Sequence, residues 1–144
     1  MGDQIVYPPL PKPTELTRHF WEGAAEHRLV ILRCQACGFY LHPPRPICRR
    51  CRSWEVGPEE VSGRGELYTY TVTETPFHPY WADKVPYVVA VVTLEEQPDL
   101  RVITNVVNCP EEKLRVGLPV EVTFVEAAPE LTLPVFRPSF RPTA

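Results

Sequence analysis

Two Cys-x-x-Cys pairs constrain this chain more than any other feature of its sequence. The first pair is Cys34 and Cys37, the second is Cys48 and Cys51, and ten residues separate them. Each such turn presents two sulfur atoms from one tight loop, so two turns supply the four thiolates of a tetrahedral metal site. Thiolate donors in this geometry favour zinc ahead of iron. The sequence therefore predicts a four-cysteine zinc site, and the metal-like spacing disfavours the alternative of two disulfides.

A zinc ion held by four cysteines has no open coordination position, so the predicted ion is structural rather than catalytic. Gly38 follows the first pair, at a place that often needs a positive φ. Arg52 takes the matching place after the second pair. We expect the second turn to be less strained than the first, or built differently.

The residues around the cysteines predict a zinc ribbon over residues 28–54. Apolar residues at 29–32 indicate a strand that enters the first turn, and residues 39–42 indicate the return strand. This unit is too small for a hydrophobic core of its own, so the metal must supply its stability. His42 is an alternative ligand in principle, but four cysteines already fill the site.

The pattern changes after Trp54 to alternating apolar and β-branched residues between glycine and proline turns. Residues 56–61 are interpreted as a bridge into this second unit. The chain's 18 prolines also argue against long helices. Five strands of this kind within about 80 residues predict a small Greek-key barrel of the OB type over residues 55–136, in a mainly β protein. The expected strands are 66–75, 85–94, 100–107, 119–125 and 131–136.

The segment before the ribbon predicts an extended arm and an amphipathic helix over residues 14–27, with Thr14 as its N-cap. Phe20 and Trp21 would either pack on the protein's own core or dock on a partner. Residues 137–144 are expected to form an extended tail. The sequence shows neither a signal-peptide pattern nor a membrane-spanning apolar run, so we expect a cytoplasmic location.

Positive charge is concentrated in the predicted ribbon. Residues 28–54 hold six arginines and no acidic residue, although the whole chain has a net charge of −3. A cationic patch on an acidic body suggests a specific anion or an acidic partner surface, not general nucleic-acid binding. Arg45, Arg49 and Arg50 are the candidate contacts.

An aromatic loop joins the first two predicted barrel strands. Residues 75–84 carry Phe77, His78, Tyr80 and Trp81, which would mark a ligand pocket or interface, or else fold back to cap the barrel. The sequence has three serines, none in a nucleophile elbow, and its four histidines lack the spacing of a second metal site. We therefore expect no catalysis by this chain alone.

The order of these parts resembles one known family. The residues that carry the resemblance are Phe20-Trp-Glu-Gly23, the two cysteine turns with Pro43-Pro-Arg-Pro46, Ser62-Gly-Arg-Gly65, Val85-Pro-Tyr-Val-Val-Ala90, Arg115-Val-Gly-Leu-Pro-Val120 and Leu133-Pro-Val-Phe-Arg-Pro138. Together they are similar to the rubredoxin-like zinc-ribbon/OB-fold proteins that accompany thiolase-like enzymes of acyl-CoA metabolism.

That resemblance implies an accessory subunit. Its thiolase-like partner would supply the catalytic residues, and acyl-CoA would bind at or near the shared interface, for example in retro-aldol cleavage of a steroid side-chain thioester. Two other functions stay open at this point. Ribbons and OB barrels also occur in nucleic-acid-binding proteins, and iron at the four cysteines would make a one-electron carrier.

Overall fold

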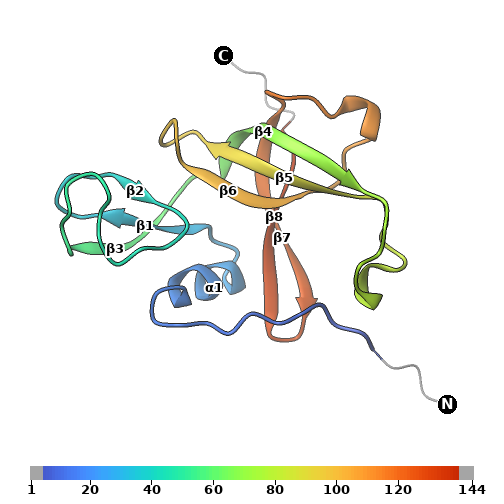
Figure 1. Cartoon of the computed structure of the whole chain (residues 1–144), viewed down its shortest axis with the longest axis horizontal. Helices are drawn as coiled ribbons and strands as arrows, with labels where there is room; N and C mark the ends of the chain where they lie inside the picture. Colours follow the sequence, from blue (N-terminus) through green and yellow to red (C-terminus); the bar gives the residue numbers. More distant parts are fainter. Residues whose placement is uncertain (1–4, 140–144) are drawn as a thin grey trace.

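The computed structural model describes residues 5–139, in which one short helix and a three-stranded sheet precede a closed five-stranded barrel (Figure 1). This arrangement confirms the predicted fold class. The elements are α1 (Arg18–Ala25), β1 (Val30–Cys34), β2 (Tyr40–Leu41), β3 (Val56–Glu60), β4 (Arg64–Thr73), the 3-10 helix η1 (Pro79–Trp81), β5 (Tyr87–Leu94), β6 (Arg101–Val106), the 3-10 helix η2 (Glu111–Lys113), β7 (Pro119–Ala128) and β8 (Leu131–Pro138).

The barrel closes in the order β4-β5-β6-β8-β7. Its pairs are antiparallel except for β6 and β8, which run parallel where Val106 faces Phe136. Inward side chains of the strands fill the interior, and Phe136, Leu67 and Leu94 are almost completely buried there. The period-two alternation in the sequence therefore marks the side of each strand that faces the core.

The ribbon sheet has the order β2-β1-β3, and its third strand was not predicted. Val56–Glu60 pairs with β1 over five residues, so the ribbon sheet extends past the predicted boundary at residue 54. Its sequence, Val-Gly-Pro-Glu-Glu, lacks apolar alternation. Pro58 is tolerated because β3 lies at the edge of the sheet, where a missing N–H donor leaves no central ladder bond unmade.

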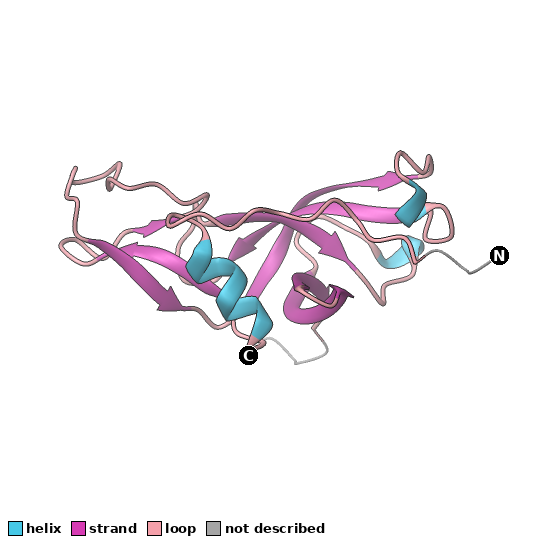
Figure 2. Cartoon of the chain, turned by 90° about the horizontal axis from the view of Figure 1, so that it is seen from below, coloured by secondary structure: helices cyan, strands magenta, loops and turns pink. Residues whose placement is uncertain are grey.

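Helix α1 lies between the ribbon and the barrel, in contact with β1 and β8 (Figure 2). It is shorter than the predicted 14–27, because residues 15–17 form turns and His27 adopts a φ of 58°. Phe20 packs against the barrel core, and Trp21 packs against Ala127 and Leu131. Both side chains are half-buried and pack on the protein's own core, which is one of their two predicted roles, and docking on a partner stays a prediction.

The two ends of the chain differ in part from the prediction. Residues 5–13 have no regular secondary structure. Arg137 and Pro138 belong to β8, where Arg137 pairs with Glu121, so the predicted tail begins too early. The rest of that tail, residues 140–144, lies outside the described residues. No helix in the described part of the chain is long and apolar enough to cross a membrane.

Candidate metal centre

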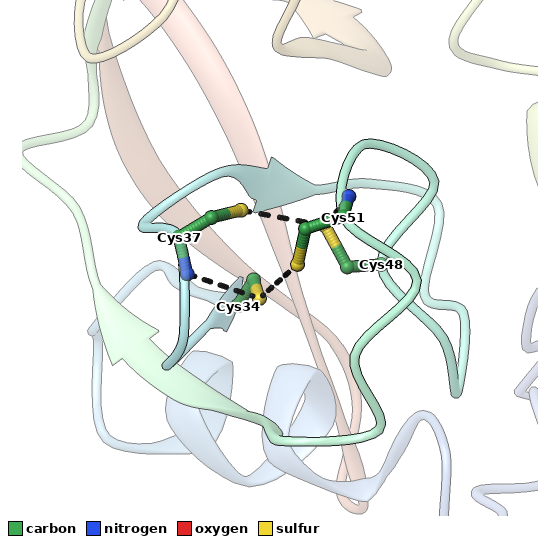
Figure 3. Close-up of side chains that lie close together, drawn as sticks. All are labelled: Cys34, Cys37, Cys48 and Cys51. Carbon is green, nitrogen blue, oxygen red and sulfur yellow. Dashed lines mark hydrogen bonds between the residues drawn. The ribbon is translucent and has the colours of Figure 1, made fainter.

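The sulfur atoms of Cys34, Cys37, Cys48 and Cys51 converge on one point between the two turns (Figure 3). All four lie within 4.8 Å of one another. The Sγ atoms of Cys34 and Cys51 are 3.5 Å apart, and those of Cys37 and Cys48 are 3.6 Å apart. A tetrahedral zinc ion with Zn–S bonds of about 2.3 Å has sulfur–sulfur edges of about 3.8 Å. The donor set and its spacing therefore fit a zinc ion.

The two cysteine turns have the same construction. Cys37 N donates to Cys34 Sγ at 3.4 Å, and Cys51 N donates to Cys48 Sγ at 3.5 Å. Gly38 has a φ of 81°, and Arg52 has a φ of 64° in the equivalent place. The expectation of a different second turn was therefore wrong. A left-handed conformation costs a non-glycine residue about 1–2 kcal/mol, which the metal centre must offset.

The protein shields one side of this centre. Cys34 and Cys48 are buried against Leu32 and Leu41, whereas Cys51 is exposed. The pKa of the Cys34 thiol lies below its ordinary value, chiefly because the Cys37 N–H points at its sulfur. A lowered thiol pKa favours the thiolate, which is the form that binds metal.

Arg33 holds the three ribbon strands together beside the first turn. Its Nε donates to Gly38 O at 2.8 Å, and its Nη1 donates to a carboxylate oxygen of Glu59 on β3 at 2.9 Å. The guanidinium also lies 4.5 Å above the centre of the Tyr40 ring on β2. These contacts give the ribbon packing that its small apolar core cannot supply.

Half of the six arginines in the predicted cationic patch are paired with acidic residues. Arg28 pairs with Glu60, Arg33 with Glu59, and Arg49 with Asp99. The sequence-based count omitted these acids because β3 and the β5–β6 turn were assigned outside the ribbon. Three ribbon arginines have no ion pair with a described residue: Arg45, Arg50 and Arg52.

The three arginines predicted to contact a ligand or partner, Arg45, Arg49 and Arg50, have different surroundings. Arg49 and Arg50 lie over the Phe39 ring, at 4.9 and 5.9 Å from its centre. Arg45 lines a groove of about 540 Å³ between α1 and the ribbon. Trp54 borders the same groove and is 72% exposed, yet the sequence offered no signal that separates it from a buried tryptophan.

The aromatic loop folds back on the barrel end. Tyr80 packs against the cluster of Ala127, Ala128 and Leu131, and the Trp81 ring meets those of Tyr80 and His78 edge-on. His78 Nδ1 accepts a hydrogen bond from Tyr80 N at 3.1 Å. Phe77 is the exception, because its side chain is 82% exposed. Of the four predicted residues, Phe77 is thus the most available to another molecule.

His42 lies away from the four sulfur atoms. Its ring stacks on Phe20, and its buried Nδ1 has no hydrogen-bond partner, as is also true of His19 Nε2. Burial, followed by the charge of His19, lowers the pKa of His42 to about 4. Burial also lowers the pKa of His19. Both imidazoles are therefore neutral at pH 7.

Two family descriptions match most of the chain. Residues 21–56 match "ChsH2, rubredoxin-like zinc ribbon domain", and residues 58–125 match "ChsH2, C-terminal OB-fold domain". The zinc ribbon description and the four converging thiols agree on a structural zinc ion.

Individual proteins are also similar to this chain in sequence. A "probable enoyl-CoA hydratase alpha subunit" from Thermomonospora curvata is 47% identical over 121 residues, which are 83% of this chain but 37% of that protein. A "DUF35 domain-containing scaffold protein" from Methanocaldococcus jannaschii is 35% identical, over 72% of this chain and 73% of the relative.

A solved structure, "Ltp2-ChsH2(DUF35) aldolase", contains a chain that is 43% identical, with a TM-score of 0.82. The match covers 90% of this chain and 98% of that one. Sequence motifs, domain order and three-dimensional structure thus agree, and this chain belongs to the ChsH2/DUF35 family of zinc-ribbon and OB-fold proteins.

Proposed function

We propose that this chain is a non-catalytic accessory subunit of a thiolase-like enzyme that acts on acyl-CoA thioesters. The observation that carries this proposal is the likeness to the ChsH2(DUF35) chain of an aldolase, which extends over 98% of that chain. The name of that structure places its DUF35 chain beside a second protein, Ltp2. Hetero-oligomeric assembly is therefore the expected state of this chain as well.

In this proposal the metal has a structural role. Cys34, Cys37, Cys48 and Cys51 would hold the zinc ion, which supplies a cross-link between the two turns and no reactive site. The side chains that pack with the four cysteines are apolar: Leu32, Leu41, Phe39 and Val56. The reaction would take place on the partner.

Two surfaces of the chain suit a partner or a CoA ester. Phe77 projects from a loop whose other aromatic residues are anchored, so it offers an apolar contact at low entropic cost. Arg45 and Arg50 retain guanidinium groups without an ion pair to a described residue. Planar guanidinium groups suit phosphate or carboxylate, so we assign them to CoA phosphates or to acidic residues of the partner.

Within acyl-CoA chemistry, we propose carbon–carbon bond cleavage by the partner, with a steroid side-chain thioester as the substrate. The likeness to an aldolase subunit supports cleavage over thiolysis or acyl transfer. The nucleic-acid alternative receives less support from the charges. It would require a basic face, whereas Arg28, Arg33 and Arg49 are paired with carboxylates.

Co-expression with a thiolase-like protein from the same genome tests the proposal. The two chains should co-purify through gel filtration as one complex, and the complex should cleave the steroid thioester while this chain alone does not. A chain that elutes alone, beside a partner that is fully active and stable without it, would disprove the accessory role.

A further inference from the structure

The β5–β6 turn, residues 95–100, is one place where the barrel meets the ribbon, in addition to Ile31 and Tyr40, which pack with the barrel core. It is fixed to the barrel by Leu94 and Leu100, each 1% exposed, and Leu94 N donates to Leu100 O at 2.8 Å. Within the barrel, Arg64 donates to Glu95 at 2.8 Å. Both ends of the turn are therefore anchored in the barrel core.

Three other side chains of this turn bond outside the barrel strands. Glu96 accepts a hydrogen bond from the backbone N of Ser62, in the linker between ribbon and barrel, at 2.7 Å. Gln97 and Asp99 reach the ribbon itself. Such a concentration of contacts in six residues distinguishes this turn from an ordinary solvent-exposed hairpin turn.

The side chain of Gln97 forms the hydrogen bonds with the ribbon that a neighbouring strand would form. Tyr40 N donates to Gln97 Oε1 at 2.9 Å, and Gln97 Nε2 donates to Tyr40 O at 3.1 Å. β2 is an edge strand of the ribbon sheet, so these Tyr40 groups have no neighbouring strand on that side. The side-chain amide thus satisfies both backbone groups at once.

Asp99 forms an ion pair with the second cysteine turn. Its carboxylate accepts from Arg49, which lies between Cys48 and Cys51 in the sequence. Tyr40 likewise follows the first cysteine turn by three residues. The two ribbon segments that bond to this turn are therefore the two beside the metal centre, and the small apolar cluster around Leu32 and Leu41 is too limited to order them without metal.

We propose that the β5–β6 turn is a zinc-dependent latch, in which metal binding shapes both cysteine turns so that Gln97 and Asp99 can join the ribbon to the barrel. With zinc bound, the two units behave as one body. After zinc loss, the ribbon separates from the turn while the barrel stays folded. This inference goes beyond the proposed function, and it needs no partner protein.

Zinc release from the full-length zinc-loaded chain tests the latch. The rate is measured with a colorimetric chelator for the wild type, Gln97→Glu, Asp99→Asn and the control Glu95→Gln, which removes a charge from the same turn without touching the ribbon. Loss of the Gln97 donor should speed release about five-fold, as expected for one net hydrogen bond. Asp99→Asn should have a smaller effect because its ion pair is half-exposed. Equal rates for Gln97→Glu and Glu95→Gln would overturn the proposal.

Hydrogen exchange of the wild type gives a second readout that does not depend on any variant. Chelation should raise exchange at the Tyr40 N–H, which donates to Gln97, while buried β5 amides such as that of Val92 stay protected. Unchanged protection of the Tyr40 N–H after complete zinc removal would show that the junction does not depend on metal. Simultaneous loss of protection at Val92 would also reject the latch, because it would mean that zinc supports the whole chain.

Discussion

His42 of the ribbon stacks on Phe20 of helix α1, with ring centroids 5.6 Å apart and ring planes 29° apart. This contact joins the end of β2 to the helix that packs on the barrel. The stacked imidazole is mostly buried, and its Nδ1 has no hydrogen-bond partner. A proton on this ring would place an uncompensated charge between the ribbon and helix α1. The stability of this contact therefore depends on pH.

Acidification should therefore weaken the fold. Burial lowers the pKa of His42 from 6.5 to about 4, so the unfolded chain binds the proton more tightly than the folded one. The stability is fully present above pH 6.5 and is lost as the pH falls toward 4, by at most about 3 kcal/mol. Urea unfolding between pH 7 and pH 4 measures it. The variant His42→Phe keeps a stacked ring and should lose less stability over this range; an identical loss would contradict the assignment.

Removal of a thiol should abolish metal binding. Cys34→Ser and Cys51→Ser each delete one of four converging sulfur atoms, so both variants should retain little zinc and unfold at lower temperature. Cys109→Ser is the matched control, because Cys109 packs against the barrel core away from the cluster. Atomic absorption measures the zinc content of each variant, and a thermal melt measures its unfolding temperature. Full zinc in either ligand variant would refute the ligand set.

Alanine substitutions at two glycines test two different costs, which are steric overlap with a neighbouring strand at Gly65 and backbone strain at Gly117. A Cβ at Gly65 would lie 2.3 Å from Thr93 O on the paired strand, so Gly65→Ala should cost roughly 3 kcal/mol of unfolding free energy. Gly117 has a φ of 91° and open space around it, so Gly117→Ala should cost only about 1 kcal/mol. Chemical denaturation compares the two. An equal or smaller cost at Gly65 would mean that β4 and β5 can move apart.

Phe77 should matter to assembly and not to folding. Its exposed ring makes Phe77→Ala nearly neutral for the melting temperature, while a lost interface anchor should weaken partner binding about ten-fold. Val116→Ala, 69% exposed on another loop, is the control. Titration of the partner by calorimetry measures both variants. Equal affinities would remove Phe77 from the interface, even if the complex itself forms.

Trp81→Ala should behave differently from Phe77→Ala. Trp81 packs against Tyr80, His78 and Tyr87, so its removal loosens the loop that presents Phe77. We expect unchanged zinc content, a lower melting temperature and weaker complex formation or acyl-CoA turnover. If Trp81→Ala left both stability and assembly unchanged, the loop would have no role in presenting Phe77.

Local patterns in the sequence were enough to predict the metal centre and most of the barrel. The Cys-x-x-Cys spacing defines four ligands because each pair is fixed by one short turn. Alternation of apolar residues marks barrel strands because successive side chains point to opposite faces. The aromatic loop was also recognised, although its two possible roles could not be separated.

Tertiary structure decided the features that depend on distant partners. β3 is a strand because β1 supplies its hydrogen bonds, and its carboxylates then neutralise Arg28 and Arg33. Gln97 looks like an ordinary turn residue until the fold brings it to Tyr40, 57 positions away. The sequence alone determined which residues can bind zinc and which faces are apolar, since both follow from spacing along the chain. Which charges are paired, and where ribbon and barrel meet, follow only from contacts between segments that the chain itself keeps far apart.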